Sequence, residues 1–487
     1  MSGFHVENFG CRAARADGEA ISRHLNAAGH TAQQPSSADV VIVNTCSVTA
    51  EADRAARAFI RRAHRINPEA RIVVTGCYAQ RAPEELAALT GVSAVVGNSH
   101  KAFAPQIALD LIAQASPLNS SSGNPGGLVQ IQAAIAASAP LQVVDDRFAH
   151  SFLEETQLVP GAQTRPNLKI QEGCGNRCTF CVIPQTRGGS RSLPAAAVFK
   201  QVEGFVAAGG NELVFSGINL GRWGRDLPHA PTLSSLVRRI FAETPLPRLR
   251  LSSIEPMDWD TEMIALMADF GGSRLARHAH LPLQSGSDAV LRRMHRRYRP
   301  WHYEEKVRAL FQAAGTDLTL GADLMVGFPG ETDAEFEETM ELVRKLPFAY
   351  LHIFPFSPRP GTRGSTLHAE RPVSPQLVDQ RLGALRALAL EKSKTHRRRF
   401  LGRELEAITL HTPPELEQSG RTTALTENFL PLEIEARLPA NQLVRVRITA
   451  LSADGTLQAV TDSKASFQFA ATAMPITTTG ARFRPIS

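Results

Sequence analysis

The chain has 487 residues, of which 43% are hydrophobic and 21% are charged. This is an ordinary globular composition, and the length predicts two to four domains. No run of about 18 apolar residues is present, which excludes a membrane-spanning helix. The net charge of +6 and the pI of about 9.1 favour a polyanionic partner only weakly. The N-terminus, MSGFHVENFGCRAARADGEA, lacks a basic stretch followed by an apolar core, so we expect no secretory signal and a cytoplasmic protein.

The first segment, residues 1–110, alternates apolar strands with helical patterns. Strands are expected at FHVENFGC, ADVVIVNTC, ARIVVTGC and VSAVVG, because short apolar runs of this kind are buried in parallel sheets. Helices are expected at DGEAISRHLNAAG, EADRAARAFIRRAHRIN and APEELAALTG, and Gly29 ends the first of them. The alternation predicts an α/β domain with an open parallel sheet.

Residues 111–165 interrupt this pattern. The stretch ASPLNSSSGNPGG is rich in Ser, Gly, Pro and Asn, which is typical of a loop or linker. The part that follows has no clear period, so we expect a linker here and assign it no helix or strand.

Residues 166–395 contain a second βα series. Helical patterns such as PAAAVFKQVEGFVAAGG and DAEFEETMELVRKL separate six candidate strands. Six repeats predict a parallel barrel, complete or partial, with its chemistry at the carboxyl ends of the strands. The candidate strands are LKIQEG, ELVFSG, LRLSS, HAHLPL, LTLGADLMVG and YLHIFPF.

The pattern changes again in residues 400–463. The short runs ELEAITLH, GRTTALTE, FLPLEIEA, LVRVRITALS and TLQAVT are separated by turns, which predicts a small all-β domain. From Arg403 to Asp462 this domain has five Arg against nine Asp plus Glu, so it is acidic. The polar segment 464–487 is expected to form an irregular tail.

Three cysteines lie within eight residues in the stretch QEGCGNRCTFCVIP, at the spacing C-x3-C-x2-C. A cubane iron–sulfur cluster takes four ligands and so does a structural zinc, but only Cys174, Cys178 and Cys181 are present here. In a large chain without a leader, such cysteines are more often metal ligands than disulfide partners. The spacing therefore predicts a metal centre with one open position. The alternative is a zinc knuckle that lacks one ligand.

The other three cysteines are far apart in sequence but share a position. Cys11, Cys46 and Cys77 each follow the end of a predicted strand, in NFGC, VIVNTC and IVVTGC. The carboxyl ends of parallel strands lie on one edge of a sheet, where such folds bind ligands. We therefore expect a second cluster of three thiols, against the alternative of buried core cysteines.

The stretch CGNRCTFC resembles the signature of the radical S-adenosylmethionine (SAM) superfamily. This resemblance implies a partial (βα)6 barrel, in agreement with the six strands. It also implies a 4Fe–4S cluster whose open iron is bound by the amino and carboxylate groups of SAM. Reduction of the cluster then cleaves SAM to methionine and a 5′-deoxyadenosyl radical.

Most of the chain resembles the methylthiotransferases of this superfamily. The resemblance is carried by FGCRAARADGEAI, VNTCSVTAEADRAAR, GCYAQRAPEEL, HAHLPLQSGSDAVLRRMHRRYRPWHY, DLMVGFPGETDAEFEET and LHIFPFSPRPGT. It implies that Cys11, Cys46 and Cys77 hold a second 4Fe–4S cluster, and that the C-terminal domain is a TRAM-like RNA-binding barrel. One cluster then provides the methylthio group and the other the radical that removes hydrogen from an unreactive carbon.

Six further residues at or near strand ends are candidate SAM contacts. The backbone could approach a ligand closely at Gly217. Other candidates at or near strand ends are Ser253, Glu255, Gln284 and Asp323, for which loop capping and turn formation are as good an explanation as ligand contact. Phe180, inside the cysteine loop, could shield the cluster or the adenine, or could simply pack.

The family resemblance leaves three substrates open. NTCSVTAEADRAAR and GCYAQRAPEEL are most similar to the branch that modifies C2 of N6-threonylcarbamoyladenosine at position 37 of tRNA. The alternatives within the family are isopentenyladenosine in tRNA and an aspartate of a ribosomal protein. An alternative of another class is a non-catalytic metal-bearing protein that binds RNA or senses redox state.

The expected partners are the tRNA anticodon loop and a reducing protein such as flavodoxin or ferredoxin, with no membrane. The basic runs RRMHRRYR (292–299) and KSKTHRRR (392–399) are usually solvated helix faces, but beside an RNA-binding domain they could contact phosphate.

Overall fold

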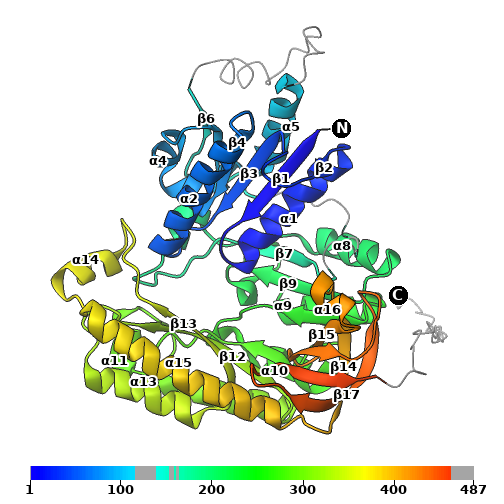
Figure 1. Ribbon diagram of the computed structural model, residues 1–487. Helices are drawn as coiled ribbons and strands as arrows, with labels where there is room; N and C mark the ends of the chain where they lie inside the picture. The colour runs from blue at the N-terminus through cyan, green and yellow to red at the C-terminus, as the bar shows by residue number, and fades with distance from the viewer. Residues whose placement is uncertain (1, 116–138, 153–157, 159, 161–163, 462–487) are drawn as a thin grey trace, which may run out of the picture.

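Three units follow one another along the chain in the computed structural model, which describes residues 2–115, 139–152, 158, 160 and 164–461. An N-terminal sheet domain lies above an open barrel, and a small closed β-barrel packs against the side of that barrel (Figure 1). Among the described residues, no helix has the length and apolar content needed to cross a bilayer.

The N-terminal sheet is parallel throughout, with the strand order β2-β1-β3-β4-β5-β6. Every residue of β3 is buried, as expected for a strand that begins with four apolar residues in a row. The sequence predicts the four central strands, and the structure adds the short β2 and β6 at the two edges. The strands are β1 (Gly3–Asn8), β2 (Thr31–Ala32), β3 (Val40–Thr45), β4 (Arg71–Gly76), β5 (Val92–Gly97) and β6 (Leu141–Val143).

Helices cover both faces of this sheet. One face packs against α1 and α5 through a core that includes Leu25 and Leu111, and the other packs against α2, α3 and α4 through Ile60 and Leu86. The predicted open parallel sheet is therefore confirmed, with layers on both sides (Figure 1). The helices are α1 (Arg12–Ala27), α2 (Ala50–Ile66), α3 (Cys77–Arg81), α4 (Pro83–Ala87), the 3₁₀ helix η1 (Asn98–Phe103) and α5 (Ala104–Ala115).

The second unit is the predicted partial barrel, and all six expected strands are present. The strands β7, β9 and β10 form one parallel ladder, and β11, β12 and β13 form another. Only a backbone bridge and single hydrogen bonds, such as Ile254 N–H to His280 O at 3.1 Å, join the two ladders among the described residues. The strands are β7 (Asn167–Glu172), β9 (Glu212–Gly217), β10 (Arg248–Leu251), β11 (His278–His280), β12 (Thr319–Val326) and β13 (Phe348–Pro355), and β8 (Arg191–Ser192) pairs antiparallel with β7.

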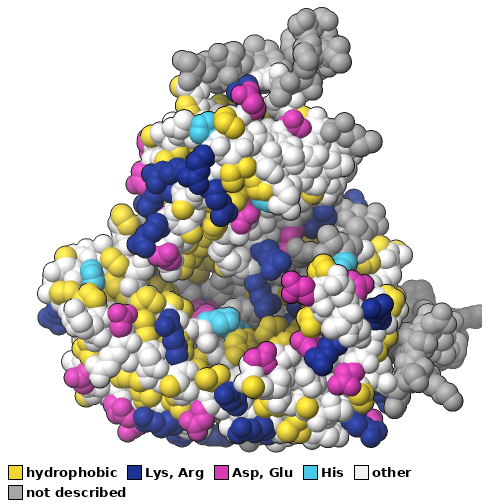
Figure 2. All heavy atoms as spheres, in the orientation of Figure 1, with side chains coloured by type: hydrophobic (Ala, Val, Ile, Leu, Met, Phe, Trp, Pro, Cys, Tyr) yellow, Lys and Arg dark blue, Asp and Glu magenta, His cyan; other side chains and the backbone are white. Residues whose placement is uncertain are grey.

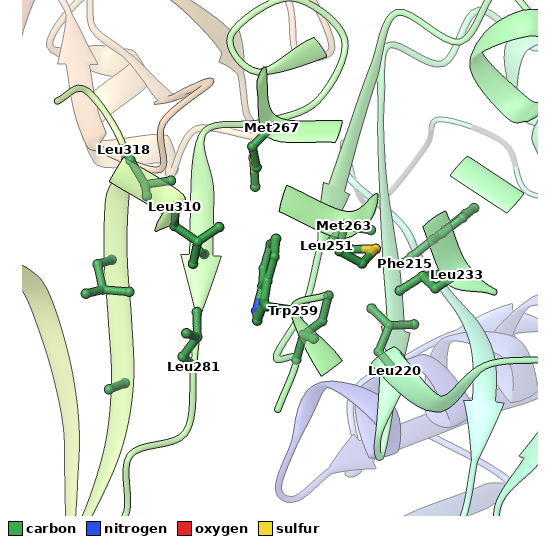
Figure 3. Close-up of a cluster of buried hydrophobic side chains, with 14 of the residues drawn as sticks. Phe215, Leu220, Leu233, Leu251, Trp259, Met263, Met267, Leu281, Leu310 and Leu318 are labelled. Carbon is green, nitrogen blue, oxygen red and sulfur yellow. The ribbon is translucent and has the colours of Figure 1, made fainter. Parts of the chain in front are cut away.

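Helices wrap the outside of this barrel and bury its largest core. Trp259 lies in the middle of that core, among leucine and methionine side chains from both strands and helices (Figure 3). Burial on this scale fixes the strands whose ends carry the functional residues. The helices are α7 (Ile183–Arg187), α8 (Ala195–Ala207), η2 (Leu220–Arg222), α9 (Leu233–Glu243), η3 (Pro256–Asp258), α10 (Thr261–Phe270), α11 (Asp288–Arg293), α12 (Pro300–Ala314), α13 (Asp333–Lys345), α14 (Arg363–Glu370) and α15 (Pro375–Arg398).

The other face of the same strands is polar. In β10, Leu249 and Leu251 belong to the outer core, while Arg248 and Arg250 alternate with them. Arg250 Nε donates to Glu212 Oε1 of β9 at 2.8 Å, and Arg248 Nη1 lies 3.4 Å from Glu212 Oε2. Because successive side chains of a strand point to opposite faces, the barrel interior is lined by charged and polar groups. Such an interior indicates a binding site rather than a packed core.

The third unit is the predicted all-β barrel, closed in the order β14-β15-β16-β18-β17. Its turn at residues 427–429, here called the docking turn, reaches the end of the large barrel opposite the cysteine loop. Arg277 Nε donates to Glu427 Oε1 at 2.8 Å, and the Phe429 ring stacks on His278 with centroids 4.2 Å apart. The elements are β14 (Glu404–Thr409), α16 (Pro414–Gln418), β15 (Thr422–Thr426), β16 (Pro431–Ile434), β17 (Leu443–Leu451) and β18 (Leu457–Val460).

Candidate active site

The cysteine loop begins directly after β7. Gly173 has φ +69°, and a Cβ there would lie 2.0 Å from the Gly189 carbonyl oxygen, so the sharp turn out of the strand requires glycine. Cys174, Cys178 and Cys181 then line one cavity of about 550 Å³. The structure therefore brings the first predicted triad together at the carboxyl end of the barrel.

Hydrogen-bond donors are aimed at the sulfurs of this loop. Arg296 Nη1 lies 3.3 Å from Cys178 Sγ, and Asn219 Nδ2 lies 3.7 Å from Cys174 Sγ. Burial, with the neighbouring Cys178 and Cys174, raises the pKa of the Cys181 thiol to about 12. Burial also raises the pKa of the Cys174 thiol. Buried thiols faced by N–H donors fit a bound cationic iron centre, which would take them as thiolates.

The second predicted triad is also brought together. Cys11 caps the start of α1 after β1, Cys46 follows β3, and Cys77 opens α3 after β4, and these three strands are neighbours in the sheet. Gly10 has φ +105°, and a Cβ there would lie 2.6 Å from Cys46 Sγ. Burial raises the pKa of Cys46 to about 12, and the nearby Cys11 and Cys77 add to the shift.

Donors face this triad as well. Arg187 Nε lies 3.2 Å from Cys77 Sγ, and Asn98 Nδ2 lies 3.3 Å from it. Burial lowers the pKa of Arg187, but the charges of Cys77, Glu172 and Asp17 outweigh this and raise it well above its usual value. The Arg187 side chain thus stays cationic beside the Cys77 sulfur, which matches the Arg296–Cys178 contact of the first triad.

Arg187 belongs to a buried ion cluster that crosses the boundary between the sheet domain and the large barrel. Asp17 forms ion pairs with Lys101 of its own domain and with Lys169 of β7. Lys169 also pairs with Glu172. Arg187 Nη1 lies 2.5 Å from Glu172 Oε1. The members of the buried ion cluster are Asp17, Lys101, Lys169, Glu172 and Arg187, each at most 3% exposed.

A cavity of about 470 Å³, here called the central cavity, has Cys11 of the second triad in its lining, together with Asn219, whose side chain reaches Cys174 of the first triad. It is lined by Cys11 from the second triad and by strand-end residues of the barrel. Figure 2 shows a hollow below the N-terminal domain, with Lys or Arg and His side chains inside it. Four of the predicted cofactor contacts line the central cavity: Gly217, Ser253, Glu255 and Asp323.

Three of these four residues are held by specific partners. Glu255 Oε2 accepts a 2.5 Å hydrogen bond from Arg296 Nη2, the same side chain that reaches Cys178. Ser253 Oγ lies 3.0 Å from His280 Nδ1. Asp323 Oδ1 lies 3.4 Å from His280 Nε2 and 3.3 Å from His352 Nδ1.

The Asp323 group could bind a hydroxyl-bearing ligand or a cation. Burial raises the pKa of its carboxyl, but hydrogen bonds from His280 and His352 outweigh burial and lower it well below the usual range. One ligand atom from each of these three residues lies within 4.8 Å of the others. The carboxylate therefore stays ionised and points at the central cavity, where a ribose hydroxyl or a divalent ion would find an acceptor.

Two predicted cofactor contacts do not line the central cavity. Phe180 is half-buried and packs against the large hydrophobic core. Gln284 has φ +64° and is 7% exposed, and its backbone pairs with Asp323 and Met325 of β12. Among the described residues, its side-chain oxygen has no hydrogen-bond partner. A role in cofactor binding for either residue stays a prediction.

Several residues of the site were not anticipated from the sequence. His280, His352 and Tyr350 line the central cavity from β11 and β13, and Arg12 lines it from the first turn of α1. The alternating patterns HAH and YLH could have indicated these residues. A polar residue at every second position of a strand lies on the face that points away from the hydrophobic core. Arg296 was predicted only as part of a basic run, yet it is 7% exposed and bound to Glu255.

Comparisons with known proteins agree with this geometry. The Radical SAM superfamily matches residues 168–343, and an uncharacterized protein family, UPF0004, matches residues 3–97. A threonylcarbamoyladenosine tRNA methylthiotransferase, MtaB, of Bacillus subtilis is 34% identical over 88% of each chain. The chain belongs to the radical SAM methylthiotransferase family. It is therefore an enzyme, and the superfamily implies a 4Fe–4S cluster and SAM in the barrel.

Other relatives within this family carry two different names. The MtaB protein of Aquifex aeolicus is 32% identical over 91% of this chain and 99% of its own. A tRNA-2-methylthio-N(6)-dimethylallyladenosine synthase of Erythrobacter litoralis is 33% identical over 84% of this chain and 86% of its own. Among solved structures, the radical SAM methyltransferase TsrM of Kitasatospora setae is 16% identical, with a TM-score of 0.48 over 72% of each chain.

Proposed function

We propose that this enzyme transfers a methylthio group to C2 of N6-threonylcarbamoyladenosine at position 37 of tRNA. The observation that carries the proposal is the central cavity, which is lined by residues of both domains, including Cys11 of one triad and Asn219, which contacts Cys174 of the other. A carbon that must lose hydrogen at one centre and gain sulfur from another has to sit within reach of both. The names of the MtaB relatives support the nucleoside.

We further propose that both triads hold 4Fe–4S clusters, one through Cys174, Cys178 and Cys181 and the other through Cys11, Cys46 and Cys77. In each triad an arginine N–H faces a sulfur, from Arg296 and Arg187. When bound, the clusters and SAM would supply the radical that removes hydrogen from the substrate carbon and the methylthio group that replaces it. The chain would orient SAM through Gly217, Ser253, Glu255 and Asp323, while Phe180 and Gln284 would shape its surroundings.

The tRNA would approach over the N-terminal domain as well as the C-terminal barrel. Figure 2 shows Lys or Arg side chains gathered over α2, where Arg54, Arg61, Arg62 and Arg65 are exposed. Helix α2 begins two residues after Val48, which lines the central cavity, so the basic face would start close to that cavity. Cationic rows of this kind contact nucleic-acid backbones. The acidic TRAM-like barrel would then contribute shape rather than charge.

The proposed domains are 1–110 for the auxiliary cluster, 166–395 for the radical chemistry and 400–463 for RNA binding, with the linker 111–165 and the tail 464–487. The structure adds that β6 (Leu141–Val143) joins the first sheet from within the linker, and that α5 extends to Ala115. A cytoplasmic location, with flavodoxin or ferredoxin as the electron donor, fits a tRNA substrate and a cluster that must be reduced.

Nucleoside mass spectrometry tests the substrate. In a strain that lacks the gene, the 2-methylthio derivative of threonylcarbamoyladenosine should disappear from tRNA and return on complementation. Loss of the 2-methylthio derivative of isopentenyladenosine instead would favour the second name carried by the relatives. No change in either nucleoside would leave the ribosomal aspartate as the family substrate to examine.

Two cysteine variants test the division of labour. The reconstituted protein should hold about eight irons, and Cys11→Ala should hold about four. Cys11→Ala should abolish methylthio transfer but retain reductive cleavage of SAM, whereas Cys178→Ala should abolish both. Retention of methylthio transfer by Cys11→Ala would contradict the two-cluster proposal.

A further inference from the structure

The central cavity contains one charged side chain whose charge is not matched. Its carboxylates are engaged: Glu255 binds Arg296 at 2.5 Å, and Asp323 lies between His280 and His352. Arg12, on the α1 side, lines the same cavity and is exposed to it, yet it pairs with no carboxylate among the described residues. Its guanidinium carbon lies 5.7 Å from the centroid of the Phe429 ring.

The surroundings of Arg12 add to the positive charge. Arg250 also faces Phe429, at 5.3 Å, and its Nη1 has no hydrogen-bond partner among the described residues. Arg165, Arg248 and Arg250 all contact the buried carboxylate of Glu212, and of these three only Arg248 has a second carboxylate partner, Glu406, among the described residues. This end of the central cavity therefore attracts an anion.

We propose that Arg12 binds the carboxylate of an amino-acid substituent on the substrate nucleoside. This assignment rests on the proposed function, which places a modified adenine in the central cavity. C2 and N6 belong to the same purine base, on its six-membered ring, so a substituent on N6 must lie within or beside that cavity. Arg12 follows Cys11 in the chain, and a guanidinium binds a carboxylate through two parallel hydrogen bonds. A threonylcarbamoyl group offers that carboxylate.

The same geometry disfavours a neutral substituent. An isopentenyl chain in this position would cover the Arg12 guanidinium without giving it a partner, which leaves a desolvated charge. Sites built for a polar group discriminate strongly against an analogue that lacks it. Arg12 would thus select between the two nucleosides named for the relatives of this chain.

The test compares anticodon stem-loop RNAs that differ only at position 37. The holoenzyme is titrated with RNA that carries threonylcarbamoyladenosine, its carboxyl methyl ester or isopentenyladenosine. Wild type should bind the acid about ten- to a hundredfold more tightly than the ester. Arg12→Gln should lose that preference and bind the ester as wild type does, and Arg12→Lys should keep part of it because the charge remains.

A matched control lies on the same helix. Arg15 is exposed and pairs with Glu19 at 3.3 Å, so Arg15→Gln should retain the wild-type preference for the acid. Equal weakening of all three RNAs by Arg12→Gln would indicate a phosphate contact and overturn the assignment. A loss of SAM affinity, measured by equilibrium dialysis, would assign Arg12 to the methionine carboxylate instead.

An error in the proposed function and an error in the role of Arg12 would give different results. If wild type adds no methylthio group to the threonylcarbamoyladenosine RNA, the proposed substrate is wrong. If wild type modifies that RNA and Arg12→Gln keeps the full preference for acid over ester, only the role of Arg12 is wrong.

Discussion

Replacing Asp17 by asparagine removes one of only two carboxylates in the buried ion cluster. Asp17 contacts Lys101, Lys169 and Arg187, and it is 1% exposed. Burial alone would raise the pKa of Asp17, but these three cations outweigh burial and lower it, so it is ionised at neutral pH. Asp17→Asn leaves three buried cations facing Glu172 alone. Breaking a buried pair in this way costs about 3–5 kcal/mol.

The loss should appear at the boundary between the two large domains. Asp17 and Lys101 belong to the sheet domain, whereas Lys169 and Glu172 belong to β7. Hydrogen exchange of peptides from α1 and β7 should therefore become roughly 10²- to 10⁴-fold faster in Asp17→Asn. Peptides from the C-terminal barrel, which the buried ion cluster does not touch, should exchange as in wild type.

Two further variants make the reasoning refutable. Asp17→Asn combined with Lys101→Met removes one charge of each sign and should recover much of the lost protection, a coupling that a double-mutant cycle measures. Glu51→Gln removes an exposed partner of Arg54 and should cost less than about 1 kcal/mol. Unchanged exchange in Asp17→Asn, or a double variant with the summed cost of both changes, would refute the charge-balance argument.

Three more predictions concern the triads and the docking of α15. Gly10→Ala places a Cβ 2.6 Å from Cys46 Sγ at φ +105°, so the iron content should fall from about eight to about four while SAM cleavage persists. Arg296→Met removes the N–H that faces Cys178 Sγ, so the barrel cluster should become harder to reduce in a titration followed by electron paramagnetic resonance, while Arg292→Met on the exposed pair with Asp288 should not. Burial, with Arg399 and Arg397, lowers the pKa of His396 to about 4, so the unfolded chain takes up a proton between pH 6.5 and 4 that the folded chain does not. The free energy of unfolding should therefore decrease as the pH is lowered through that range, by up to about 1.4 kcal/mol per pH unit. Urea titrations at pH 7.5 and pH 5 should show a smaller decrease for His396→Gln than for wild type.

The main strands were predictable because each is a compact apolar run with a clear boundary. ADVVIVNTC is typical of a buried strand, and every residue of β3 is indeed buried. The edge strands β2 and β6 have two and three residues, and so short a segment contains no period to detect. Their pairing is decided by the neighbouring strand rather than by their own sequence.

The candidate site was predictable where one motif or one sheet edge gathers its members. The rule that parallel strands end at one edge is sufficient to group Cys11, Cys46 and Cys77. No such rule groups the members of the buried ion cluster. Its five charged residues come from separate places along the chain, and in the sequence each one looks like an ordinary surface residue. The basic run at 292–299 illustrates the same limit, since Arg293 pairs with Glu335 and Arg296 with Glu255 inside the fold.

Through the docking turn, the C-terminal barrel forms part of the lining of the large barrel. Phe429 stacks on His278 and lies against Arg250 and Arg12, so an aromatic ring of the C-terminal barrel sits at the end of the large barrel opposite the cysteine loop. Truncation before Arg403 would remove the Phe429 ring and let bulk water reach the interior of the large barrel from the end opposite the cysteine loop. A truncated enzyme should then consume SAM without modifying substrate, because its radical would be quenched by small molecules. The C-terminal barrel would thus protect the reaction, in addition to the RNA-binding role proposed for it.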